Sequence, residues 1–246
     1  CTTVICTDKT GTLTQNEMTV TDVYVGEREL KVTGAGYAPE GQVIAQGRPV
    51  TASADADLAL LMSAVLLCND SRLLPPNGES TRWTILGDPT EAALKVVALK
   101  AGLNAAEVAE QCPRVRVLPF DSRRKRMSTI HQVMIDGRPA RLAYVKGAPR
   151  EVLDLCTSRW VNGRESPLDD EARAKVLAVN DRYARAGLRV LAVAWRQPGR
   201  DLLASGTAGL TVDSVEKGLT FLGLVAMTDP ARPEVAAAVE SAHRAG

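Results

Sequence analysis

An aspartate followed by a lysine, a glycine and several threonines stands near the start of the chain, in the stretch DKTGTLT that begins at Asp8. A carboxylate at the end of a strand can attack a phosphoryl group and form an acyl phosphate, which divides one transfer into two easier steps. The following residues offer phosphate oxygens a cation, hydroxyl groups, backbone N–H groups and close backbone approach. They are Lys9, Thr10, Gly11 and Thr12. A polar β-turn is the alternative interpretation of D-K-T-G alone.

The segment TTVICTD, residues 2–8, is predicted to be a strand buried on both faces of a parallel sheet, because it is short, apolar and β-branched. Ligands bind beyond the carboxyl ends of such strands, where Asp8 would lie. After it the pattern changes to alternating strands and helices. The predicted strands cover residues 18–25, 28–34, 114–120, 126–135, 140–146, 188–195 and 219–227.

Helices are predicted from Asp55 onward, at 88–101, 148–155 and 169–186, and after the prolines near residue 230. The second has the clearest signals: Asp88 as N-cap, Pro89 at the first helical position and Gly102 as the stop. Glu91 is placed to complete a capping box with Asp88. Loops are predicted between residues 34 and 54 and over residues 202–210.

The order of these elements predicts a mixed α/β (α+β) fold, in which an antiparallel sheet flanked by helices is inserted into an incomplete α/β domain. A length of 246 residues allows one large domain or two modest ones. The net charge of +1 gives no general attraction for nucleic acid or an anionic membrane. We therefore expect a soluble monomer with no nucleic-acid partner.

The five cysteines are odd in number and scattered, which favours free thiols in a reducing compartment. The longest apolar helical stretch, residues 59–68, is about half the roughly 20 residues of a membrane span. A start at Cys1 without methionine predicts a piece of a longer protein. His131 and His243 have no partners at metal-ligand spacing and are expected on the surface.

Four further residues have types that suit a nucleotide. Phe120 ends a predicted strand, where a ring would be either a stacking surface for a purine or part of the core. Lys146 closes an apolar strand, where it is either an exposed terminus or a cation that needs an anion; Gly147 would let the backbone approach a ligand. Arg189 is a charge in an apolar strand, and either a phosphate or a buried carboxylate would pair with it.

Seven motifs occur in order along the chain: DKTGTLT, LCND, GDPTEAAL, FDSRRKRMS, YVKGAP, GLRVLAVA and MTDPAR. This series resembles the cytoplasmic nucleotide-binding region of P-type cation-transporting ATPases, especially the calcium-pump-like P2 subgroup. The resemblance implies a nucleotide-binding domain at 17–229 inserted into a haloacid-dehalogenase-like Rossmannoid phosphorylation domain, of which 1–16 and 230–246 are parts.

The resemblance also assigns roles to individual residues. It implies that Asp8 is the phosphorylated nucleophile, that Lys9 and Thr10 assist it, and that Asp8 and Thr10 hold Mg²⁺. It implies that ATP is bound by a set of residues spread over the chain, namely Glu91, Phe120, Lys125, Lys146, Gly147, Arg189, Leu191, Asp229 and Arg232.

Within this set, Phe120 would stack on adenine and Glu91 would hydrogen-bond near its amino group, a role that competes with the capping box. Lys125 belongs to the run Arg123–Arg126, which composition alone predicts to be a solvated face. Asp229 would lie at the hinge between the two domains. Arg150 and Ala231 depart from the family's usual glutamate and proline.

The resemblance implies a parent in the cell membrane, with this region cytoplasmic and partnered by the actuator and transmembrane parts of the same pump. The TGD loop, the distal lysine and the GDGxND motif of the family do not follow Asp229, so this piece is expected to bind ATP without completing catalysis. Calcium is the first candidate for the transported ion, ahead of protons, sodium or magnesium. A haloacid-dehalogenase-type phosphatase and a non-enzymatic interaction module are the alternatives; against the former, Thr10 stands where those phosphatases carry a second aspartate.

Overall fold

A computed structural model describes residues 4–77, 80–135, 137–197 and 208–244. Its main feature is a sheet of eleven strands, nine of which form one continuous order. That order is β4 (Arg48–Val50), β3 (Val43–Ala45), β2 (Arg28–Val32), β1 (Thr19–Val25), β13 (Leu219–Thr228), β12 (Arg189–Arg196), β9 (Arg138–Gly147), β8 (Arg126–Ile135) and β7 (Arg114–Asp121). Every pair along it is antiparallel, as predicted.

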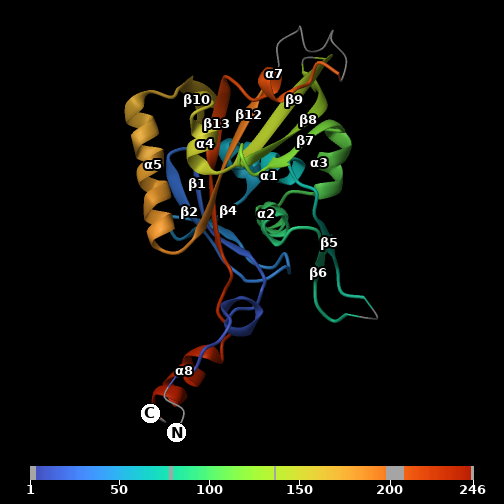
Figure 1. The fold of residues 1–246 in the computed structure, drawn as a ribbon. Coiled ribbons are helices and arrows are strands. Elements are labelled where there is room, and N and C mark those ends of the chain that lie inside the picture. Colours follow the sequence, from blue (N-terminus) through green and yellow to red (C-terminus); the bar gives the residue numbers. More distant parts are fainter. Residues whose placement is uncertain (1–3, 78–79, 136, 198–207, 245–246) are drawn as a thin grey trace.

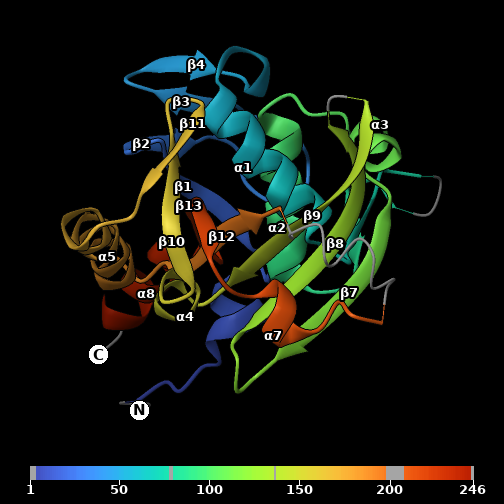
Figure 2. The same cartoon turned by 90° about the horizontal axis from the view of Figure 1, so that it is seen from above.

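Helices cover both faces of the sheet (Figures 1 and 2). One face is covered by α1 (Ala56–Leu67), α2 (Pro89–Lys100) and α3 (Ala105–Gln111). The other is covered by α4 (Pro149–Leu153) and α5 (Asp170–Arg185), and two further helices are α7 (Val212–Val215) and α8 (Val235–Arg244). No described helix is both long and apolar enough to cross a membrane.

The central strands alternate between two hydrophobic cores. Val193 of β12 joins the core under α1 and α2, whereas its neighbours Ala192 and Ala194 join the core under α5. Strand β13 is buried along nearly its whole length because both of its faces are covered. Leu58 and Leu61 of α1 are fully buried, and each such side chain contributes about 1.5–3 kcal/mol relative to an exposed one. These two cores fix the central strands between the helices.

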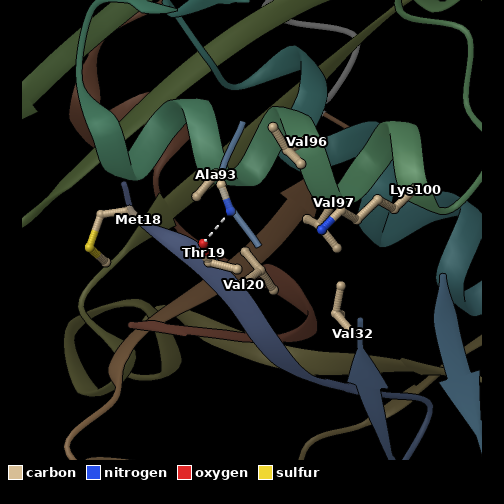
Figure 3. Close-up of a pocket in the computed structure, with 9 residues that line it drawn as sticks. Met18, Thr19, Val20, Val32, Ala93, Val96, Val97 and Lys100 are labelled. Atoms are coloured by element: carbon tan, nitrogen blue, oxygen red, sulfur yellow. Dashed lines mark hydrogen bonds between the residues drawn. The ribbon is translucent and has the colours of Figure 1, made fainter. Parts of the chain in front are cut away.

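Helix α2 begins and ends where the sequence predicts. The Asp88 side chain caps its first turn, Pro89 follows, and Gly102 stands just beyond the end with a φ of 89°. Against the sheet, α2 leaves only a narrow gap with no room for a water molecule (Figure 3). Val97 of α2 and Val20 of β1 both line that gap and belong to the same hydrophobic core, so packing against the sheet fixes the helix.

Several short elements are absent from the sequence-based prediction. They are β3 and β4 in the predicted loop, the hairpin of β5 (Arg72–Leu74) and β6 (Thr84–Leu86), the pair β10 (Cys156–Val161) and β11 (Arg164–Pro167), and the helices α3 and α7. Each strand of the first two pairs has only three residues, too few for a visible alternation. Most of the predicted loop over residues 202–210 lies outside the described residues.

The predicted strand at the start of the chain is wrong for the residues that the structure describes. Residues 4–8 form no strand and are exposed; Val4 and Ile5 are 71% and 69% exposed. A strand needs neighbours that accept and donate its backbone hydrogen bonds. Among the described residues no strand lies beside this segment, so its apolar composition alone does not order it.

The two ends of the chain leave the sheet together (Figure 1). An isolated antiparallel bridge joins Thr14 to Ala231. The Gln15 amide donates to the Pro230 carbonyl at 3.0 Å, and the Arg232 amide donates to the Leu13 carbonyl at 2.9 Å. This two-stranded connection, which we call the neck, is the only described link between the sheet and the segments at either end.

His131 is buried in the middle of β8, with 1% exposure, so the predicted surface position is wrong, whereas His243 is exposed in α8. The His131 ring lies between the Cys112 carbonyl at 2.8 Å and the Thr129 hydroxyl at 2.9 Å. The burial of His131 could not be predicted from the sequence. Residues 127–131 of β8 are all buried, so this part of the strand lacks the polar-apolar alternation of a half-exposed strand.

This burial predicts a pH-dependent stability. Burial lowers the pKa of the His131 imidazole below its ordinary value of 6.5. The unfolded chain therefore takes up a proton before the folded chain does, and the free energy of unfolding falls as pH drops from 6.5 toward the lowered pKa. Urea unfolding at pH about 7.5 and about 5.5 measures this slope. The His131→Asn variant should show a flatter slope, and equal slopes would contradict the assignment.

Candidate functional site

A pocket of about 590 Å³ opens where α2, β7, β9 and β12 come together. This volume is within the range of about 300–1,000 Å³ that is usual for small-molecule sites. The lining residues come from distant parts of the sequence, namely Asp70, Asp88, Thr90, Glu91, Leu94, Pro119, Phe120, Lys125, Met127, Lys146, Gly147, Ala148, Arg189, Val190 and Leu191. Seven of the nine residues that the resemblance assigns to ATP are in this set.

Phe120 is an exposed ring in the pocket wall. It stands near the end of β7 and is 63% exposed, which excludes the core position, whereas the other phenylalanine, Phe221, is buried. An aromatic face held open to solvent at the rim of a pocket is a surface on which a flat heterocycle can stack.

The first turn of α2 supplies carboxylates. Asp88 accepts from the Thr90 amide at 2.8 Å and from the Glu91 amide at 3.2 Å, which confirms the predicted N-cap. The predicted capping box does not form. Instead Glu91 Oε2 accepts from the Asp70 amide at 2.9 Å and Oε1 accepts from Lys146 Nζ at 2.7 Å.

Lys146 and Glu91 form a largely buried ion pair, with side chains 6% and 14% exposed. The exposed-terminus interpretation of Lys146 is therefore wrong. A cation in this position is tolerated because the carboxylate compensates its loss of water. Both charges border the pocket, so a bound anion would meet a lysine that the protein already holds in place.

Gly147 is required by the protein's own backbone. A Cβ at this position would lie 2.4 Å from the Lys125 carbonyl oxygen and 2.7 Å from the Arg126 Cα. The close approach expected between Gly147 and a ligand is therefore already made to the turn that connects β7 and β8.

Lys125 and Arg189 add two cations from other elements. Lys125 Nζ donates to Glu151 Oε1 at 2.6 Å and is 57% exposed, and this hydrogen bond lowers the pKa of the Glu151 carboxyl. Arg189 is the exposed first residue of β12, not a charge within it, and donates to the Thr90 hydroxyl at 2.9 Å. In the described chain it pairs with no carboxylate. Leu191 lies two residues further and is half-buried.

Asp229 and Arg232 lie at the neck and not in the pocket. Asp229 accepts from the Thr14 hydroxyl at 2.5 Å and from the Glu17 amide at 3.3 Å. Arg232 donates to the Gly11 carbonyl at 2.9 Å. These bonds tie the end of β13 to the DKTGTLT loop.

Asp8, Lys9 and Thr10 are exposed and do not line the pocket. The Mg²⁺ site predicted at Asp8 and Thr10 stays a prediction. Across the described residues, no group of three His, Cys, Asp or Glu side chains is placed to hold a metal ion. Mg²⁺ generally needs one or two carboxylates plus substrate phosphates, and no step of the chemistry is assigned to it.

The basic run Arg123–Arg126 is only partly a solvated face. Arg123 is exposed, but Arg124 and Arg126 both pair with Glu216, at 2.5 and 2.6 Å, and the Glu216 side chain is 0% exposed. Sequence reasoning missed Glu216. Two arginines at alternate positions do indicate a shared acidic partner. The spacing of the sequence cannot locate that partner when it lies about 90 residues away.

The fold and the pocket define a domain with an antiparallel sheet and one pocket of the size that is usual for small-molecule sites. The family described as "P-type ATPase, cytoplasmic domain N" matches residues 57–234, which include every residue that lines the pocket. The chain therefore belongs to the N-domain family of the P-type ATPases.

Relatives of the chain carry the names of cation-transporting and calcium-transporting ATPases. The chain is 41% identical over 247 residues to "Probable cation-transporting ATPase F" of Mycobacterium tuberculosis, covering 100% of this chain and 26% of that protein. It is 35% identical over 246 residues to "Calcium-transporting ATPase" of Bacillus subtilis, with the same two shares, 100% and 26%. It is 36% identical over 243 residues to "Calcium-transporting ATPase type 2C member 1" of Bos taurus, covering 97% of this chain and 22% of that protein. The chain thus spans about a quarter of the length of these relatives.

Proposed function

We propose that this chain binds ATP in the pocket between α2, β7, β9 and β12. The observation on which the proposal rests is the arrangement of Phe120, a ring 63% exposed, in one pocket with three cations from separate elements. The ring offers a stacking face for adenine. Lys125, Lys146 and Arg189 offer positive charge to the phosphates, and Arg189 retains guanidinium donors beyond its bond to Thr90.

The acidic side of the pocket suits a base that carries an exocyclic amino group, as adenine does. Glu91, Asp88 and Asp70 present carboxylate oxygens, which accept hydrogen bonds. At the six-position of the ring the adenine amino group donates, whereas the guanine oxygen accepts; the donors of guanine lie at N1 and at its 2-amino group, so guanine would have to bind in a different orientation. Glu91 is held by Lys146 and the Asp70 amide, so its position is set before a ligand enters.

For the whole protein we propose a P-type ATPase that moves a cation across a membrane. An Asp8 carboxylate oxygen attacks the γ-phosphorus of ATP, forms an acyl phosphate and releases ADP, and water later hydrolyses that bond. Mg²⁺ would enter with the triphosphate. We propose calcium as the transported ion because two of the relatives above are named calcium-transporting. Protons, sodium and magnesium are the alternatives.

This assignment places the region on the cytoplasmic side of the membrane, with the actuator and transmembrane parts of the same pump as partners and no nucleic acid. Asp8 does not line the pocket, so phosphoryl transfer requires a movement at the neck. We propose domain boundaries after residues 16 and 229, where Asp229 joins the two chain segments. We expect the chain to bind ATP without turning it over, because Asp8 does not line the pocket.

Isothermal titration of the chain with ATP tests the binding proposal. We expect saturable heat with ATP, weaker heat with GTP, and the weakest with inorganic triphosphate, which lacks a base to stack. Absence of saturable heat at millimolar ATP would refute the proposal. Equal affinity for ATP and inorganic triphosphate would refute the role of the ring.

A further inference from the structure

Glu216 is a buried carboxylate outside the pocket. It caps the C-terminal end of α7, three residues before β13 begins, and its side chain is 0% exposed. A charge in this position is costly unless hydrogen bonds satisfy both of its oxygens.

Three donors satisfy Glu216, and all come from the start of β8 and the turn before it. Arg124 Nη1 donates to Oε1 at 2.5 Å, and Ser128 Oγ donates to the same oxygen at 2.6 Å. Arg126 Nε donates to Oε2 at 2.6 Å. One carboxylate thus holds three residues of the segment that follows Phe120.

Arg124 extends this hold to the pocket wall. Its Nη2 donates to the Pro119 carbonyl at 2.7 Å, directly before Phe120. The turn between them is closed by Asp121, which accepts from the Arg124 amide at 2.9 Å. Lys125 has a φ of 52°, a left-handed conformation that costs a residue with a Cβ about 1 kcal/mol or more. The turn therefore needs outside contacts to keep its shape.

We propose that Glu216 is a positioning residue that fixes the turn of residues 121–126, and with it Phe120 and Lys125, for nucleotide binding. The inference rests on the proposed ATP site and adds to it a residue that does not line the pocket. Glu216 acts through Arg124 and Arg126. Their planar guanidinium groups hold their hydrogen-bond donors in fixed directions, which a lysine ammonium group would not do. Glu216 precedes β13, the central strand of the sheet, by three residues. Its bonds therefore fix the position of the turn relative to that strand.

The test is the Glu216→Gln variant, titrated with ATP alone and in the Phe120→Ala background. Glutamine keeps the volume but replaces one acceptor oxygen with a donor that faces arginine donors. We expect ATP affinity to fall about tenfold in the otherwise unchanged chain, and less than about threefold when Phe120 is already absent, because coupled residues are non-additive. Equal losses in both backgrounds would show that Glu216 does not act through the ring.

A matched control separates positioning from stability. Asp57 is a second buried carboxylate, 3% exposed, which accepts from the amides of Asn162 and Gly163 at 2.8 Å and does not line the pocket. The Asp57→Asn variant should lower the melting temperature without weakening ATP binding. If it weakens ATP binding as much as Glu216→Gln does, the positioning role is refuted.

Two different outcomes separate the positioning role of Glu216 from the ATP site itself. Normal ATP binding by the unchanged chain and by a folded Glu216→Gln variant would overturn the positioning role alone, whereas no ATP binding by the unchanged chain would overturn both. If Glu216→Gln does not fold, Arg124→Lys replaces it, since lysine has one donor nitrogen in place of the two guanidinium nitrogens that bond Glu216 and the Pro119 carbonyl. The same affinity losses are then expected, and unchanged affinity overturns the role.

Discussion

Replacing Phe120 with alanine is expected to weaken ATP binding about 5- to 150-fold. Stacking of a base on an aromatic ring contributes about 1–3 kcal/mol, and each 1.4 kcal/mol corresponds to about a factor of ten. The ring is 63% exposed without ligand, so its removal should change the free energy of unfolding by less than about 0.5 kcal/mol. Isothermal titration and urea unfolding of the same preparation measure both quantities.

Two variants serve as controls for Phe120→Ala. Phe120→Tyr keeps an aromatic face and should retain most of the affinity. Met134→Ala removes a side chain of similar exposure, 64%, from the far end of β8 and should leave affinity unchanged. A Phe120→Ala chain that binds ATP as tightly as the unchanged chain would place the base elsewhere.

The Gly147→Ala variant is expected to lose both stability and ATP affinity. The new Cβ would lie 2.4 Å from the Lys125 carbonyl oxygen, a backbone atom that cannot rotate away. Either the turn or β9 must shift, at a cost of about 1–3 kcal/mol or more, which lowers the melting temperature by roughly 2–10 °C in a chain of this size. The shift separates Lys125 from Lys146, so we expect ATP affinity to fall at least about tenfold. Thermal unfolding and calorimetry measure the two effects.

Gly47→Ala is the matched control for Gly147→Ala. Gly47 lies between β3 and β4, at the opposite edge of the sheet, with φ of 78° and no atom within 4 Å of an added Cβ. Alanine there should cost about 1 kcal/mol from backbone conformation alone and leave ATP affinity unchanged. If Gly147→Ala matches this control in both measurements, the close contact of Gly147 has no role in the site.

The pocket depends on sheet geometry more than on any one motif. Its exposed ring, Phe120, comes from the end of β7, and its cations come from the β7–β8 turn, the end of β9 and the start of β12. These strands are neighbours in the sheet, with β12 paired to β9 and β9 paired to β8. Two hydrophobic cores hold the strands, so the groups that line the pocket are positioned by the fold itself.

Local patterns in the sequence identified most of the long elements. The prediction for β8, residues 126–135, matches its bounds, and the cap at Asp88 and the stop at Gly102 are both confirmed. These features depend on neighbouring residues: β-branched runs, a capping side chain, a glycine at positive φ. The shortest strands were missed because three residues show no periodicity.

Motif order in the sequence determined the family and named seven residues that the pocket brings together. Tertiary structure alone decided which of two interpretations each residue takes: Phe120 open to solvent, Glu91 paired with Lys146, Arg189 at a strand end, and His131 in the interior. It alone revealed Glu216, and it left residues 4–8 without a sheet to join. The reason is physical: caps and strand propensity act between near neighbours in sequence, whereas burial, ion pairing and strand pairing depend on which distant segments the packed sheet brings into contact.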